Sequence, residues 1–136
     1  KKLIDQALKD YTSKIELIGA DNIAKCCVVF DLDINIAIEN YQIAKNKAEK
    51  DNIEVYVFDP NFEYYHINHF KKCYKNCNKE LEKHYNKSLD KIKSEVRLYT
   101  NLAQNNVLMQ NAINNCKVNK DNRTNFYELM EFLINI

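Results

Sequence analysis

The chain contains one glycine, Gly19, and one proline, Pro60, among its 136 residues. Tight turns, hairpins and phosphate-binding loops rely on these two residue types, so few such elements are expected. Hydrophobic residues make up 46% of the chain and charged residues 29%, which is typical of a soluble globular protein. We therefore predict an all-α fold.

Apolar residues at helical spacing predict a bundle of about five helices in a single helical domain, residues 1–136. Gly19 lies where a left-handed residue would end the first helix, and Asp21 can cap the second. The predicted helices span about residues 2–18, 21–50, 61–99 and 102–116, and the last begins at Asn122 or Thr124.

Residues 51–60 show a period of two, in which Ile53, Val55 and Val57 alternate with other residues. This period suits a strand, but the sequence offers no second strand to pair with it. We predict an extended crossover packed on the bundle, with Pro60 in the first turn of the next helix.

Cysteines on the long third helix predict that it is a central rod to which other helices are fastened. Cys73 and Cys77 share a helical face, where they reach neighbouring helices more easily than each other. We predict one disulfide from Cys26 or Cys27 to this pair and another from the pair to Cys116, each contributing about 2–4 kcal/mol. Reduced thiols buried in the core are the alternative.

Five cysteines favour an oxidising compartment, so we predict a secreted protein. The chain shows no apolar signal-peptide core, so it would be either a mature form or an intracellular protein. No apolar run approaches the roughly 20 residues of a membrane span, and membrane insertion is not expected.

A metal site is a second interpretation of the third helix, because His66, His69, Cys73 and Cys77 form a row along it. The helix would rise about 16 Å over this row, whereas zinc ligands lie about 2.0–2.3 Å from the ion. One ion could take two of these residues at most. We therefore expect no metal and no cofactor, and exposed histidines beside a disulfide.

Catalytic motifs are not evident in the sequence, which lacks a Gly-rich phosphate loop and a metalloprotease motif. Asp31 and Asp33 resemble an acidic metal motif, but residues two apart on the predicted helix point to different sides. We interpret both as solvated charges, and we expect a non-enzymatic protein.

Lysines recur every four residues along the third helix and could bind polyanions. Interleaved acidic residues can pair with them and weaken their field, and the net charge of the chain is only +1. We therefore predict a salt-bridged surface and do not expect nucleic acid as a partner. The lysines are Lys71, Lys75, Lys79, Lys83, Lys87 and Lys91.

Five aromatic residues crowd around Pro60 and have two equally good interpretations. They could form an exposed surface that binds a partner, or a hydrophobic lid over one end of the bundle. The residues are Tyr56, Phe58, Phe62, Tyr64 and Tyr65.

The segment Cys73-Tyr74-Lys75-Asn76-Cys77, in a chain rich in Asn, Lys, Ile and Tyr, resembles the BICYCLE family of secreted salivary proteins from gall-forming aphids. The resemblance implies an effector that acts in host tissue. We therefore expect a secreted monomer or homodimer that binds a host macromolecule, with a protein as the favoured partner. The alternatives are a carrier of small apolar ligands, of the insect odorant-binding or D7 type, and an intracellular helical scaffold protein.

Overall fold

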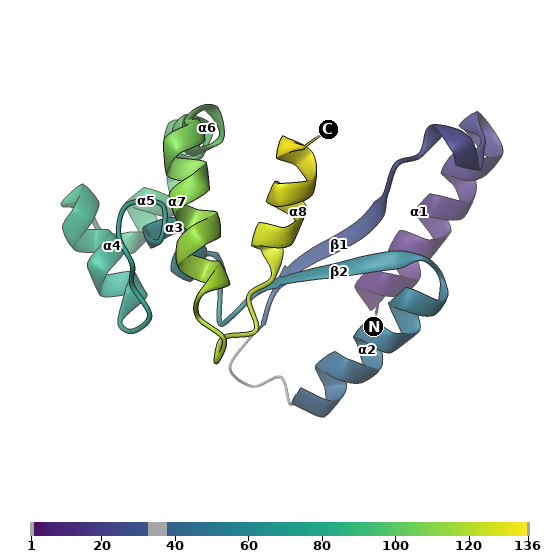
Figure 1. The fold of residues 1–136 in the computed structure, drawn as a ribbon, viewed down its shortest axis with the longest axis horizontal. Coiled ribbons are helices and arrows are strands. Elements are labelled where there is room, and N and C mark those ends of the chain that lie inside the picture. The colour runs from purple at the N-terminus through teal and green to yellow at the C-terminus, as the bar shows by residue number, and fades with distance from the viewer. Residues whose placement is uncertain (1, 33–37, 136) are drawn as a thin grey trace.

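The computed structural model describes residues 2–32 and 38–135, and this part of the chain has a mixed α/β fold (Figure 1). It contains eight α-helices, one 3₁₀ turn (η1) and two β-strands. In chain order the elements are α1 (Lys2–Ile18), η1 (Ala20–Asn22), β1 (Cys26–Asp31), α2 (Ile38–Lys50), β2 (Ile53–Phe58), α3 (Phe62–Ile67), α4 (Cys77–Tyr85), α5 (Leu89–Ser94), α6 (Val96–Gln104), α7 (Asn106–Lys117) and α8 (Phe126–Ile134).

The two strands are parallel and form the centre of the fold. Their register runs from Cys26 opposite Ile53 to Asp31 opposite Phe58. The Leu32 N–H donates to the Phe58 carbonyl oxygen at 2.8 Å, which continues the pairing past β1. Because the strands are parallel, both carboxyl ends lie at the same edge of the sheet.

Helices cover both faces of this small sheet. One face packs against α1 and α2, and the other face of β2 packs against α8 (Figure 1). Buried strand side chains of the first face alternate along β1 and β2 as the pleat requires, and they form the first core cluster together with residues of α1 and α2 and with Leu32. The cluster consists of Ile4, Val28, Leu32, Tyr41, Ala48, Ile53, Val55 and Val57.

Asn125 occupies the edge of β2 that β1 leaves free. The Val57 N–H donates to the Asn125 side-chain oxygen at 2.7 Å, and the Asn125 side-chain amide donates to the Val55 carbonyl oxygen at 3.0 Å. The Asn125 N–H also donates to the Val57 carbonyl oxygen at 3.2 Å. One asparagine thus replaces part of a third strand and fixes α8 over the sheet.

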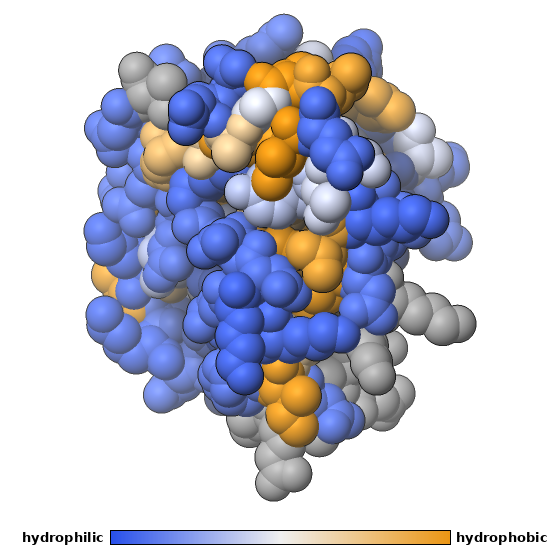
Figure 2. Space-filling model, turned by 90° about the vertical axis from the view of Figure 1, so that its right-hand side faces the viewer, coloured by the Kyte–Doolittle hydropathy of each residue, from blue (hydrophilic) through white to orange (hydrophobic). Residues whose placement is uncertain are grey.

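The outer surface on the α1 side is mostly hydrophilic, with an uneven strip of apolar side chains running down it (Figure 2). In the described part of the chain, no helix combines the length and apolar character that crossing a membrane requires.

The prediction of an all-α fold was wrong in the region of residues 21–60. The second predicted helix contains β1 and α2, and the predicted crossover is β2. Strand β1 was missed because both of its faces carry apolar side chains, which hides the period of two that marks a half-exposed strand. The part of that prediction at residues 33–37, including Asp33, lies outside the described residues.

The predicted rod over residues 61–99 was also wrong, because four helices, α3 to α6, replace it. Asn76 and Asn86 have positive φ angles of 53° and 52°, which interrupt a helix, and the Ser88 side chain caps α5. The first helix was predicted correctly, and Gly19 ends it with a φ of 84°. Near the C-terminus, Asn105 separates α6 from α7, and α8 begins at Phe126.

The predicted disulfides are absent, because all five cysteines are free thiols. Cys26 and Cys27 lie on β1, whereas Cys73, Cys77 and Cys116 belong to core clusters formed by the later helices. The continuous helix that was predicted to carry Cys73 and Cys77 on one face is replaced here by a loop and the start of α4.

We expect Asn125→Ala to lower the free energy of unfolding by about 1–3 kcal/mol, because the Val57 N–H and the Val55 carbonyl would lose their partner at a partly buried edge. Urea denaturation measures the change. Asn135→Ala, which removes an exposed hydrogen bond to the Glu131 carbonyl, is the control. Equal effects of the two substitutions would contradict the role of Asn125.

Candidate functional site

The carboxyl edge of the sheet carries one acidic residue, and a second lies in the helix that follows β2. Strand β1 ends at Asp31, and β2 leads through Asp59, Pro60 and Asn61 into α3, where Glu63 lies in the first turn. The backbone N–H of Phe62, the first residue of α3, favours the charged form of the Asp31 carboxyl and lowers its pKa.

Glu63 is buried, with 7% of its surface exposed, and Lys93 from α5 is its ion-pair partner. The Lys93 Nζ lies 3.2 Å from the Glu63 Oε1. This contact raises the pKa of Lys93 and keeps the ammonium charged. Lys93 itself is exposed, so solvent or a ligand can reach the open side of the pair.

The charges of Glu63 and Lys93 both act on Asp31. Partial burial raises the pKa of Asp31, and the charge of Glu63 raises it further. The Phe62 N–H and Lys93 act in the opposite direction. Asp31 and Glu63 together carry two negative charges against the one positive charge of Lys93, and the remaining charge of −1 favours an additional cation.

A hard divalent cation suits this pair. Mg²⁺ is commonly held by one or two carboxylates, several waters and phosphate oxygens of a substrate, and it does not require a full set of protein ligands. Within the described residues, no group of three or more His, Cys, Asp or Glu side chains is arranged to hold a metal ion. Asp31 and Glu63 can therefore supply two ligands, and water or substrate would supply the rest.

Sequence reasoning discarded Asp31 because it placed this residue on a helix. Asp31 instead ends a strand, where residues two apart share a face, so the argument from a helix does not apply. Glu63 was not selected, because its approach to Asp31 depends on the parallel pairing of β1 and β2. The signal in the sequence that could have identified Glu63 was the start of a helix directly after a strand.

The predicted partner-binding aromatics lie mostly inside the molecule. Tyr56, Phe58, Tyr64 and Tyr65 are buried, and Phe62 is half-buried. The rings of Phe58, Phe62 and Tyr65 contact one another and two rings from later helices, Tyr99 and Phe126. This burial favours the hydrophobic-lid interpretation over an exposed contact surface.

The space between α3, α6, α7 and α8 contains an apolar hollow of about 270 Å³. Residues that line it include Phe62, Tyr65, Leu102 and Met130. Ligand pockets usually measure about 300–1,000 Å³, so this hollow lies just below that range.

The histidines of the predicted metal row are buried, not exposed. His66 lies 2.8 Å from the Tyr85 hydroxyl through its Nε2, and His69 Nδ1 lies 3.0 Å from the Tyr65 carbonyl oxygen. Burial lowers the pKa of His66 to about 4. Both side chains are buried in the core formed by the helices that follow β2.

The lysine row is distributed over two loops and two helices, α4 and α5, and part of it forms ion pairs. Lys71 and Lys83 both pair with Glu80, and the Lys87 Nζ lies 2.5 Å from the Glu95 Oε1. These contacts agree with the expected pairing of lysines and interleaved acids.

A family model described as RloB-like protein matches residues 1–133. The chain belongs to the RloB-like family. This assignment corrects the resemblance to the BICYCLE effectors, which depended on one short motif and on composition. The RloB-like match spans both strands and the three residues of the candidate site, Asp31, Glu63 and Lys93. No curated protein and no solved structure matches the chain.

His66 makes the stability of this RloB-like chain depend on pH. An unfolded histidine has a pKa near 6.5, so between pH 6.5 and about 4 the unfolded chain binds a proton that the folded chain excludes. The free energy of unfolding therefore falls as the pH is lowered through this window. We expect it to be lower at pH 5 than at pH 7 by roughly 1–2 kcal/mol from this group.

Urea denaturation at the two pH values measures this difference. His66→Gln, which can still bond to Tyr85, should reduce the pH dependence, whereas the more exposed His84→Gln should change it less. An unchanged pH dependence in His66→Gln would contradict the assignment.

Proposed function

We propose that this RloB-like chain binds a divalent cation, with Mg²⁺ as the physiological ion, at Asp31 and Glu63, and uses it to act on a phosphate ester. The observation that carries the proposal is the electrostatic interaction of these two carboxylates at the carboxyl edge of a parallel sheet, with Lys93 paired to Glu63. Ligand sites of parallel α/β sheets lie at that edge. The proposal departs from the expected non-enzymatic protein, because that expectation set Asp31 aside as a helical residue, whereas Asp31 ends a strand.

Lys93 has two roles in this proposal. Without a cation, its ammonium neutralises the buried Glu63 carboxylate. When the cation binds, it takes over that neutralisation, and the long lysine side chain is free to contact a phosphate oxygen. The site would thus exchange an internal ion pair for a cation and a bound phosphate.

The chemistry follows from the charges that would meet at this site. A cation between Asp31 and Glu63 would neutralise a phosphate oxygen and make a bound water more acidic, which are the two requirements of phosphate ester hydrolysis. Asp31 is exposed enough to reach such a water, whereas Glu63 is held in place by burial and by Lys93. We therefore assign Glu63 to holding the cation and Asp31 to holding the cation and its water.

The first test is Mn²⁺ binding, measured by calorimetric titration of the purified chain. We expect Asp31→Asn and Glu63→Gln each to weaken binding by at least about tenfold, or about 1.4 kcal/mol, because each removes a charged ligand. Hydrolysis of bis-p-nitrophenyl phosphate with Mg²⁺ or Mn²⁺ then tests the reaction.

Glu54→Gln is the matched control for the acidic pair. Glu54 also pairs with a lysine, Lys25, at 2.7 Å, but it lies near the amino end of β2. This variant should bind Mn²⁺ as the unsubstituted chain does. Equal binding by all four proteins would contradict the proposed site.

Lys93→Ala separates cation binding from phosphate binding. Removing the Lys93 ammonium should tighten Mn²⁺ binding by several-fold, because the cation no longer has to displace that ammonium from Glu63. The same variant should show a higher KM for the phosphodiester. Weaker Mn²⁺ binding in Lys93→Ala would contradict the exchange of lysine for cation.

A further inference from the structure

Two thiols in the part of the chain that follows β2 lie in direct contact. The Cys73 Sγ is 3.4 Å from the Cys77 Sγ, and the Cys73 thiol also lies 3.3 Å from the Lys75 carbonyl oxygen. A disulfide requires the sulfurs to approach to about 2.0 Å, so they would move together by about 1.4 Å. We propose that Cys73 and Cys77 form a reversible disulfide, which makes this loop a redox modification site.

The backbone between the two cysteines explains why they can meet. Cys73 lies in the loop before α4, and Cys77 is the first residue of that helix. Asn76, with a φ of 53°, bends the chain between them. On the continuous helix predicted from the sequence the two thiols would not have met, so this bond differs from the inter-helix bridges that the structure excludes.

Asn68 holds the loop in the conformation that brings the thiols together. Its buried side chain donates to the Tyr64 carbonyl oxygen at 2.7 Å and to the Cys73 carbonyl oxygen at 2.8 Å, and it accepts from the Cys73 N–H at 3.1 Å. The Asn115 side chain from α7 bonds to the Asn68 carbonyl oxygen at 2.8 Å. The pair is therefore positioned before any oxidation.

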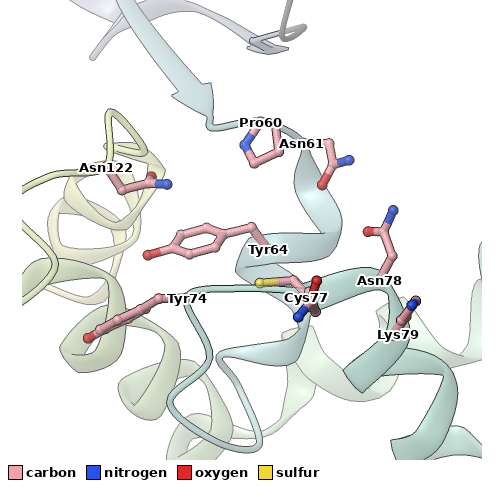
Figure 3. Close-up of a pocket in the computed structure, with 9 residues that line it drawn as sticks. Pro60, Asn61, Tyr64, Tyr74, Cys77, Asn78, Lys79 and Asn122 are labelled. Carbon is pink, nitrogen blue, oxygen red and sulfur yellow. The ribbon is translucent and has the colours of Figure 1, made fainter.

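A pocket of about 390 Å³ gives small molecules access to Cys77. It is lined by residues that include Pro60, Tyr64, Tyr74 and Asn122. In Figure 3 the Cys77 sulfur points into the space beside Tyr64. Cys73 is more deeply buried, with 7% of its surface exposed, so an oxidant would enter from the Cys77 side.

The oxidant in this proposal is a low-molecular-weight disulfide such as oxidised glutathione. One cysteine loses its proton to solvent and attacks a sulfur of that disulfide, which forms a mixed disulfide and releases one thiol. The second cysteine, after losing its proton, attacks the protein sulfur of the mixed disulfide and releases the second thiol. The protein pair loses two electrons and two protons, and the two released thiols gain them.

Burial raises the pKa of Cys77 to about 12 and that of Cys116, a third thiol nearby on α7, to about 12 as well. These thiols carry little negative charge at neutral pH, so oxidation should be slow near pH 7 and faster near pH 9. The pair would respond to sustained oxidising conditions and not to a brief pulse.

Intact-mass measurement of the full folded chain, incubated with oxidised glutathione near pH 9, tests the proposal. We expect a loss of about 2 Da, reversed by dithiothreitol, with a peptide map that places the bond between Cys73 and Cys77. The melting temperature of the oxidised chain should rise, because the bond restricts the unfolded state.

Cys116→Ser and the double variant Cys26→Ser, Cys27→Ser are the controls, and both should still lose about 2 Da. Cys77→Ser should instead keep all its hydrogens or gain a glutathione adduct. A peptide map of the unsubstituted chain that joins Cys77 to Cys116, or that shows adducts on Cys26 and Cys27 alone, would overturn the proposal without relying on any variant.

Discussion

Parallel pairing of β1 and β2 is the constraint on which the rest of this molecule depends. It aligns Asp31 with Phe58, so the chain leaves β2 beside the end of β1, and the charge of Glu63 in the following helix acts on Asp31. Two strands make a small sheet with two free edges, and Asn125 closes the outer edge of β2. The neighbouring Thr124 and Asn122 bond to the turn at Asp59, so the C-terminal segment supports both the sheet and the entry to α3.

Ion pairing then decides the chemistry that this edge can support. A buried Glu63 beside a second carboxylate would be costly without a positive charge, and Lys93 supplies it from α5. The short helices of the second half, which replace the predicted rod, are what bring Lys93 to this place. The helices that follow β2 thus contribute a positive charge to the site, and they also form a hydrophobic core.

Local signals in the sequence predicted part of this fold. The amphipathic pattern and Gly19 gave α1 correctly, and the turn-rich segment before α8 gave the last helix. Strand β1 could not be recognised alone, because its partner β2 lies 22 residues beyond its end in the chain and its apolar residues also fit a helix. Asp31 was noticed, but its pairing with Glu63 depends on a non-local contact that one sequence does not reveal.

The central claim is that Asp31 and Glu63 form a cation site at the carboxyl edge of the sheet. The most direct measurement is anomalous X-ray diffraction from crystals of the chain soaked in Mn²⁺. The account predicts an anomalous peak between the two carboxylates, with the Lys93 ammonium displaced from Glu63. Crystals that hold Mn²⁺ elsewhere, with the Lys93–Glu63 pair intact, would contradict it.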